Sequence, residues 1–138
     1  MQSQLHPYLG FRGNAREAME FYQSVFGGKL LMNTFKEYQA SSDPSEDNKI
    51  MHSQLDVDNG ISFMASDIPK RMDNNEGLNP RLSLSGDNEK ELTTYFEKLS
   101  TGGMITQPLV KSQWGDTFGM LIDRYGVNWM VNISAPKA

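Results

Sequence analysis

The chain has 138 residues, of which 38% are hydrophobic and 22% are charged, so it suits one ordinary domain with a packed core. A formal net charge of −4 without a clustered Lys/Arg run argues against a nucleic-acid partner. There is no cysteine, which excludes disulfides, thiolate metal sites and cysteine nucleophiles. No apolar run reaches the roughly 20 residues that cross a bilayer, and the N-terminus lacks signal-peptide features. We therefore expect a cytoplasmic protein with no membrane partner.

The first predicted elements are a strand and a helix. Residues 6–11 alternate as a strand does, and Asn14 is expected to cap the helix with Glu17 at the third position. The helix should end at Gly27–Gly28. Its apolar positions follow helical spacing and are Ala18, Phe21, Tyr22 and Val25.

A strand at 29–35, a polar loop at 40–48 and a hairpin complete the first half. The hairpin's first strand, 51–57, alternates so that one face carries His52, Gln54 and Asp56. Whether that face looks to solvent or lines a wet cleft depends on the register, which a two-residue or a bulged turn at 58–60 would set differently.

The same order of elements follows in the second half. A strand at 79–84 is offset by 73 (79 − 6), a helix from Asn88 by 74 (88 − 14), the Gly102–Gly103 stop by 75 (102 − 27) and the closing hairpin by 66 (126 − 60). The second helix has Glu91 at the third position and a matching apolar face, namely Leu92, Tyr95, Phe96 and Leu99. Matching elements in one order indicate an internal duplication.

The duplication predicts an α+β fold of two βαβββ modules, about 1–66 and 79–138, joined by a linker at 67–78 into one domain. We expect the helices to cover the outer sheet faces and the inner faces to curve around a shared cleft. Because sheet edges need partners, we also expect a homodimer.

Paired units of this kind are the architecture of the vicinal oxygen chelate superfamily, which includes glyoxalase I and the extradiol dioxygenases. Within it the chain resembles the PhnB-like branch, through "PYL" at 7–9, "GNAREAMEFYQSVFGG" at 13–28, "MHSQL" at 51–55, "MASD" at 64–67 and "WGDTFGMLIDRYGVNWMVN" at 114–132. Members of this branch often carry a demethylubiquinone methyltransferase label. The chain has no strand–glycine-loop–helix nucleotide site, and its "STGG" at 100–103 ends a helix. It therefore has no obvious binding site for a methyl donor.

The resemblance implies metal ligands on the first and last strands of each half, usually His and Glu. The residues at those places are His6, Met64, Asn79 and Met130. A thioether cannot offset the charge of a hard divalent ion, and Asn is a weak ligand. We therefore expect no metal cofactor, with a weakly held divalent ion at His6 as the alternative. Met64 and Met130 would instead form an apolar pocket floor.

Histidine supplies the acid–base candidates. His52 suits proton transfer because its ordinary pKa lies near neutrality, and His6 stands in the ligand place at a strand start. The simpler alternatives are a solvated strand face for His52 and a hydrogen-bonded strand end for His6.

Aromatic residues supply the ligand-binding candidates, Trp114 and Phe118. Trp114 could equally be core, whereas Trp129 alternates with Met130 and is expected to pack under a helix. Structural roles are expected for Asp67 and Asp123, and Arg81 is expected to be solvated.

Two functions remain open. The first is a protein that binds a small hydrophobic or aromatic molecule in a central cleft without the superfamily's metal centre. The second is a lyase, isomerase or dioxygenase that uses His6 or His52, or a metal. The chain offers few candidate catalytic residues, which favours the first function. The sequence leaves open whether the protein is an enzyme.

Overall fold

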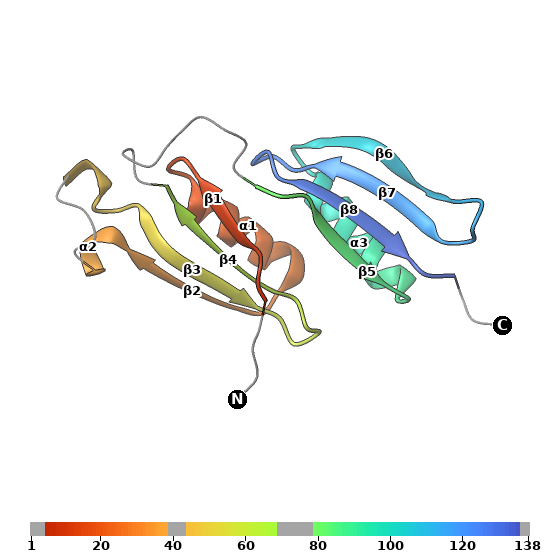
Figure 1. Ribbon diagram of the computed structural model, residues 1–138, viewed down its shortest axis with the longest axis horizontal. Coiled ribbons are helices and arrows are strands. Elements are labelled where there is room, and N and C mark those ends of the chain that lie inside the picture. The colour runs from red at the N-terminus through yellow and green to blue at the C-terminus, as the bar shows by residue number, and fades with distance from the viewer. Residues whose placement is uncertain (1–4, 39–43, 69–78, 136–138) are drawn as a thin grey trace. The chain divides into compact units, whose positions relative to one another are not determined.

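The structure is a computed structural model that describes residues 5–38, 44–68 and 79–135 (Figure 1). The chain divides into two compact units, Met1–Asn79 and Pro80–Ala138. Each unit has one four-stranded mixed sheet and one long helix, so the predicted α+β fold with two βαβββ units is confirmed. Most of the predicted linker, residues 69–78, lies outside the described residues.

Unit 1 contains the first sheet, in the order β1-β4-β3-β2. Strand β1 runs parallel to β4, while β4 with β3 and β3 with β2 are antiparallel. The described part of the predicted polar loop holds a short 3-10 turn. The elements are β1 (Tyr8–Phe11), α1 (Ala15–Phe26), β2 (Lys29–Thr34), α2 (Phe35–Tyr38), η1 (Pro44–Glu46), β3 (Ile50–Asp56) and β4 (Ser62–Asp67).

Unit 2 repeats this topology in the order β5-β8-β7-β6, with β5 parallel to β8 and the other pairs antiparallel. Its elements are β5 (Leu82–Gly86), α3 (Glu89–Ser100), β6 (Met104–Lys111), β7 (Thr117–Ile122) and β8 (Asn128–Ile133). None of the helices among the described residues is long and apolar enough to cross a bilayer.

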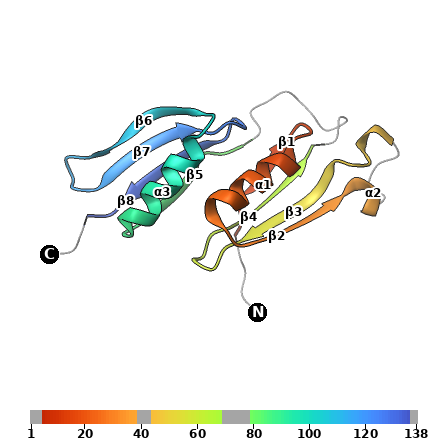
Figure 2. The same cartoon turned by 180° about the vertical axis from the view of Figure 1, so that it is seen from behind.

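In each unit the helix covers one face of its own sheet (Figures 1 and 2). Tyr22 of α1 is fully buried and meets Phe63 of β4 edge-on, with ring centroids 5.6 Å apart. Phe26 reaches the same ring at 6.2 Å. Phe21, which the sequence placed on the apolar face, is only half-buried.

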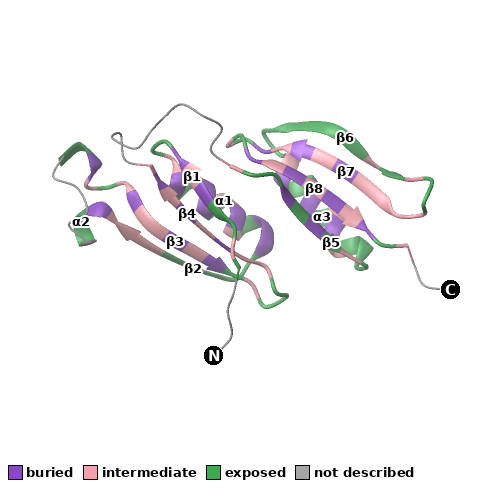
Figure 3. Ribbon diagram, viewed as in Figure 1, coloured by how far each residue is buried: buried purple, intermediate pink, exposed green. Residues whose placement is uncertain are grey.

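The second helix buries all four of its predicted apolar positions, Leu92, Tyr95, Phe96 and Leu99. Trp129 of β8 is buried, as predicted. In both sheets, buried residues alternate along the central strands with half-buried ones (Figure 3). Each sheet therefore has a packed face under its helix and an open face on the other side.

The start of α1 corrects one expectation. Asn14 makes no side-chain capping bond. Instead, the buried Asp67 accepts hydrogen bonds from the backbone N–H groups of Gly13 and Ala15, both at 2.9 Å, and from Ile50 at 2.8 Å. The carboxylate of Asp67, at the end of β4, thus accepts hydrogen bonds at the start of α1 in place of the Asn14 side chain. In unit 2 the predicted cap is confirmed, because Asn88 accepts from the Glu91 N–H at 3.1 Å.

Both double glycines follow their helices, and the second glycine of each pair has no room for a side chain. A Cβ at Gly28 would collide with the carbonyl oxygen of Asp56, and a Cβ at Gly103 would collide with that of Ile122. The glycines therefore let the chain pass close against the neighbouring strand.

The two closing hairpins have turns of the same type. Val57 N–H donates to the Ile61 carbonyl at 2.9 Å, and Asp123 N–H donates to that of Val127 at 2.9 Å. Three residues link these positions, and each turn ends on a glycine with positive φ, Gly60 or Gly126. This is the bulged form of the turn, and it fixes the register that the sequence left open.

Candidate functional site

The open face of unit 1 carries its most reactive side chains. We define this face by Tyr8 of β1, Ser62 and Met64 of β4, and His52, Gln54 and Asp56 of β3; all six are half-buried or exposed. Strand pairing sets Tyr8 beside Met64, Met64 beside Gln54, and Ser62 beside Asp56. Residues alternating with these six, such as Leu9 and Leu55, are fully buried on the helix side.

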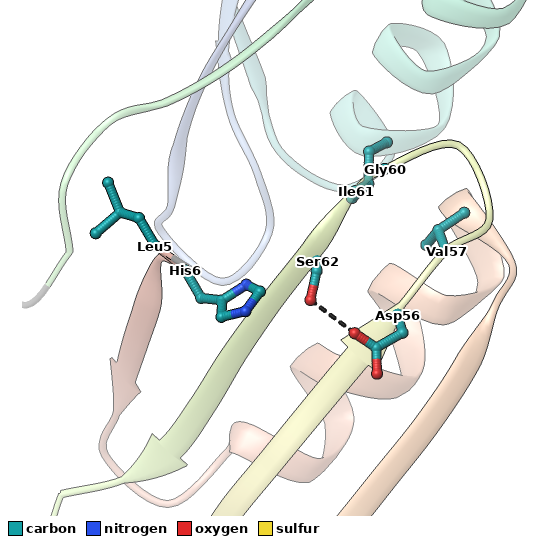
Figure 4. A pocket seen from close by; sticks show the side chains of 7 residues that line it. All are labelled: Leu5, His6, Asp56, Val57, Gly60, Ile61 and Ser62. Atoms are coloured by element: carbon teal, nitrogen blue, oxygen red, sulfur yellow. Dashed lines mark hydrogen bonds between the residues drawn. The ribbon is translucent and has the colours of Figure 1, made fainter. Parts of the chain in front are cut away.

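One end of this face is hollowed. The hollow has a volume of about 410 Å³. It is lined by Leu5, His6, Asp56, Val57, Gly60, Ile61 and Ser62 (Figure 4). The His6 ring and the Ser62 hydroxyl both point into the space in front of the β3–β4 hairpin (Figure 4).

Asp56 is the charged centre of the hollow. Its Oδ1 accepts hydrogen bonds from the Ser62 hydroxyl at 2.7 Å and from the Gln54 amide at 3.0 Å, and its Oδ2 accepts from the same amide at 3.2 Å. These bonds, Ser62 first, hold the pKa of the Asp56 carboxyl below its ordinary value, and the charges of His6 and Lys29 act in the same direction. Asp56 is therefore a well-oriented carboxylate at neutral pH.

The same bonds limit the chemistry of Ser62. A serine nucleophile needs its proton directed at a base such as histidine. The Ser62 hydroxyl donates to Asp56 instead. In this arrangement His6, Asp56 and Ser62 do not form a nucleophilic triad.

His52 lies on the open face of β3. It shares this face with Gln54 and Asp56, as strand alternation predicted. Its ring lies beside that of Tyr8, with centroids 6.2 Å apart and an interplanar angle of 48°. Both histidines of the chain thus belong to unit 1, on the same side of its sheet as the hollow.

Met64 and Met130 hold corresponding positions in the two units. Met64 pairs with Tyr8 and Gln54, and Met130 pairs with Ser83 and Met120. Each methionine is half-buried at the middle of its open face. Their proposed role as a pocket floor stays a prediction.

The strand pairing corrects the ligand place that the sequence assigned to Asn79. Since Tyr8 pairs with Met64 and Ser83 with Met130, the first strands are offset by 75 (83 − 8), not 73. Arg81, which is exposed, therefore corresponds to His6. Asn79 belongs to unit 1, where its side chain accepts from the Gly10 N–H at 2.7 Å and donates to the Gly10 carbonyl at 3.1 Å.

With this correction, the residues at the superfamily's ligand places are one histidine, two methionines and an arginine. Two neutral thioethers and a cation do not fit a hard divalent metal ion. Within residues 5–38, 44–68 and 79–135, no three His, Asp or Glu side chains are grouped so that they could hold a metal.

The open face of unit 2 is mostly apolar. We define it by Ser83 of β5, Phe118, Met120 and Ile122 of β7, and Asn128, Met130 and Asn132 of β8. Phe118 pairs with Asn132, and Met120 with Met130. Phe118, Met120 and Met130 are half-buried, which leaves part of each side chain available for a ligand.

Trp114 stands in the turn between β6 and β7 and is 69% exposed, so it is not core. Near it, Asp116 accepts from the Asn132 amide at 3.0 Å and from the Ala135 N–H at 2.9 Å. Those two bonds, with a smaller one from Trp114, hold the pKa of the Asp116 carboxyl below its ordinary value. Trp114 therefore lies at the end of the open face nearest Phe118 and Asn132.

Two aspartates that the sequence assigned to structure are structural. Asp67 caps α1, as described above. Asp123 is buried and accepts from the N–H groups of Tyr125 at 2.8 Å and Val127 at 3.1 Å, and from the Trp129 indole at 2.8 Å. Neither carboxylate is available to a ligand.

Asp56, Ser62 and Tyr8 were not among the predicted ligand-binding or catalytic residues. A signal was present in the spacing of these residues. Asp56 is two residues from Gln54 and four from His52, Ser62 is two from Met64, and Tyr8 is two from His6, so each set shares one face of its strand. Only the pairing of the strands shows that these residues share a face.

Comparison with known proteins agrees with this architecture. The two βαβββ units define the glyoxalase/bleomycin resistance fold class, shared for example with a glyoxalase/bleomycin resistance protein/dioxygenase family enzyme of Burkholderia phytofirmans (13% identity, TM-score 0.60, covering 92% of this chain and 96% of that one). Over residues 3–132 the chain matches the family described as 3-demethylubiquinone-9 3-methyltransferase, and it belongs to that PhnB-like family.

Two solved structures are particularly similar. Protein PA1353 of Pseudomonas aeruginosa is 35% identical, with a TM-score of 0.80, over 98% of this chain and all (100%) of that one. A Bacillus cereus PhnB protein, described as a putative 3-demethylubiquinone-9 3-methyltransferase, is 29% identical, with a TM-score of 0.75, over 96% and 100% of the two chains. The predicted PhnB-like resemblance is confirmed.

Proposed function

We propose that the protein binds a small hydrophobic or aromatic molecule on the open faces of its sheets, without a metal ion. The observation that carries the proposal is the half-buried methionine at the middle of each open face, Met64 or Met130, with Tyr8 beside the first and Phe118 near the second. Methionine side chains are flexible and polarizable, and they make favourable contacts with aromatic rings.

The unit 2 face supports the apolar part of the proposal. Phe118, Met120, Ile122 and Met130 are all half-buried on one side of two paired strands. A ligand ring that covers them would remove apolar surface from water, at roughly 25 cal/mol per Å². Trp114, exposed at the end of that face, stays a predicted ligand contact.

The proposal is tested by NMR of protein labelled with ¹³C in the methionine methyl groups. A panel of neutral aromatic compounds should shift the Met64, Met120 or Met130 signals through ring currents. Met19, a fully buried residue of α1, is the control. Individual Met→Leu variants assign the signals. If saturating aromatic compounds move none of the three open-face methyls, the proposal is wrong.

Tryptophan fluorescence gives a second measurement. An aromatic ligand on unit 2 should quench the exposed Trp114, and quenching should weaken on Trp114→Ala, which leaves the buried Trp129 as the only emitter. Equal quenching with and without Trp114 would exclude that residue as a ligand contact.

A second candidate function, proton transfer by histidine, is supported by the position of His6 and His52 on one side of the unit 1 sheet. A histidine base would exchange C–H for C–D next to the carbonyl of a bound carbonyl compound in D₂O. Exchange by the wild type that is lost in His52→Gln or His6→Gln would establish this function. Exchange at the buffer rate across the panel would argue against it.

We also propose that the chain forms a homodimer through a sheet edge. Strand β6 lies at the edge of its sheet, and its apolar side chains Met104, Ile105 and Val110 are 63%, 47% and 50% exposed. An unpaired apolar edge of this kind favours association. Light scattering after size-exclusion chromatography should give twice the chain mass, and Ile105→Lys should reduce it.

A further inference from the structure

The hollow of unit 1 contains a carboxylate whose negative charge is met at hydrogen-bond distance by neutral groups. The side chains that donate to Asp56 are those of Ser62 and Gln54, and both are uncharged. His6 and Lys29 act on Asp56 only through their charge, and Lys29 does not line the hollow. The lining therefore favours a ligand group that is positively charged and donates hydrogen bonds.

The acceptor geometry narrows that group further. Among the described residues, Oδ1 of Asp56 accepts from Ser62 and Gln54, whereas Oδ2 accepts only from Gln54. A carboxylate oxygen has about two acceptor sites, so the free site is on Oδ2. A guanidinium pairs best with both oxygens of a carboxylate at once, and a primary ammonium needs only one. The hollow is thus better suited to an ammonium.

The surroundings of the hollow indicate what carries the amine. Leu5, Val57 and Ile61 supply apolar walls. One step along the sheet, the open face continues with Tyr8 and Met64. Met64 is two residues from Ser62, the β4 partner of Asp56, so Met64 and Asp56 are diagonal neighbours separated by roughly 7–8 Å, which is a few bonds of a flexible chain. An aromatic ring on Tyr8 and Met64 would place a short side chain over Asp56.

We infer that the ligand is an arylalkylamine whose ammonium group binds Asp56 in the hollow and whose ring lies on Tyr8 and Met64. The inference rests on the proposed binding of aromatic molecules and adds their chemical class and orientation. It assigns Asp56 the role of the charged recognition group and Ser62 the role of holding its carboxylate in place.

The test compares three probes of one size, phenethylamine, phenethyl alcohol and 3-phenylpropionate, by calorimetry and by the methionine methyl signals. The amine should bind roughly threefold to tenfold more tightly than the alcohol, as a charged but solvent-accessible hydrogen bond permits. The carboxylate should bind most weakly. Equal affinity for amine and alcohol would overturn the inference.

Two variants that remove one unit of charge make the test specific. Asp56→Asn should abolish the preference for the amine and leave binding of the alcohol unchanged. Asp58→Asn is the matched control, because Asp58 is an exposed carboxylate in the adjacent turn that does not line the hollow. It should keep the preference. Ser62→Ala should weaken the preference partly. Retention of the preference in Asp56→Asn, or equal loss in both variants, would contradict the assignment.

The outcomes also separate this inference from the function on which it rests. If amine and alcohol both shift the Met64 methyl with equal affinity, aromatic binding stands and the amine site is wrong. If no probe shifts any open-face methyl, both proposals are wrong. Far-UV circular dichroism of each variant shows that the comparison is made on folded protein.

Discussion

The two units share one topology and differ in the chemistry of their open faces. Strand pairing aligns His52 with Phe118, Gln54 with Met120, and Asp56 with Ile122, each at an offset of 66 (118 − 52, 120 − 54 and 122 − 56). Each of these three polar positions on the open face of β3 is thus apolar in β7. The helix-covered faces stayed apolar in both, because they form the cores. The open faces differ because they are not packed under a helix, so their side chains are less constrained by the core.

Each unit also contains one buried aspartate that accepts three hydrogen bonds, but at unmatched positions. Asp67 lies at the end of β4 and Asp123 in the β7–β8 turn. We expect Asp67→Ala and Asp123→Ala to lower the free energy of unfolding by about 3–5 kcal/mol each, since each leaves two buried donors and one partly buried donor without an acceptor. Urea denaturation followed by circular dichroism measures the effect.

The asparagine variants are the controls for this comparison. Asparagine keeps one carbonyl oxygen, so Asp67→Asn and Asp123→Asn should retain the bonds to Oδ1 and lose the one to Oδ2. Their destabilisation should be smaller than that of alanine. A loss below about 1 kcal/mol in either alanine variant would show that water replaces the lost acceptor.

The second glycines of the two helix ends should behave alike. Gly28→Ala and Gly103→Ala each push a methyl group into a strand carbonyl. We expect a loss of about 2–3 kcal/mol in each case. Gly27→Ala is the control, because nothing lies within 4 Å of its Cβ and only its positive φ of 73° is strained, so it should cost less. Thermal unfolding in parallel ranks the three variants.

These cases show which features of the fold can be predicted from local sequence and which cannot. The helices were predictable because their apolar spacing, glycine stops and, for α3, the Asn88 cap are local. The cap of α1 was not, since Asp67 lies 52 residues beyond Ala15 in the chain. Likewise, the match of residues 79–84 to residues 6–11 suggested an offset of 73, whereas the pairing of β1 with β4 and of β5 with β8 sets it at 75.

The candidate site also combines features that local sequence predicts with features that it does not. That His52, Gln54 and Asp56 share a face followed from strand alternation, but the side of the sheet they occupy depended on the bulged turn. The hydrogen bonds of Asp56 depend on Ser62, a residue of the next strand whose partner no local pattern shows. Contacts between strands therefore account for most of what the sequence did not reveal.

Introducing one carboxylate should affect the two units differently. Met64→Glu would place a carboxylate on the face that also carries His6 and Asp56, which makes three potential ligands for a divalent ion in one unit. Met130→Glu would place one beside Ser83, next to the row that contains Arg81. We expect Met64→Glu to bind Zn²⁺ or Ni²⁺ at least about tenfold more tightly than Met130→Glu.

Calorimetry with each ion alone measures this difference, and the double variant Met64→Glu/His6→Gln is the control. Loss of binding in the double variant would place the metal at His6. Equal binding by both methionine variants would contradict the division into a ligand-rich and a ligand-poor face.

The smallest expected effect concerns Asp116 at the end of the unit 2 face. Hydrogen bonds from Asn132 and the Ala135 N–H hold the pKa of its carboxyl below the ordinary 3.8 in the folded protein. A group whose pKa is lowered by folding stabilises the fold above its unfolded pKa, and that stabilisation is lost as pH falls through the folded pKa. Asp116→Asn should therefore reduce the melting temperature slightly at neutral pH and leave it unchanged at pH values well below 3.8. Because Asp116 is only half-buried, solvent screens the effect. Parallel pH-dependent melts of Asp116→Asn and the wild type isolate the contribution of the Asp116 hydrogen bonds.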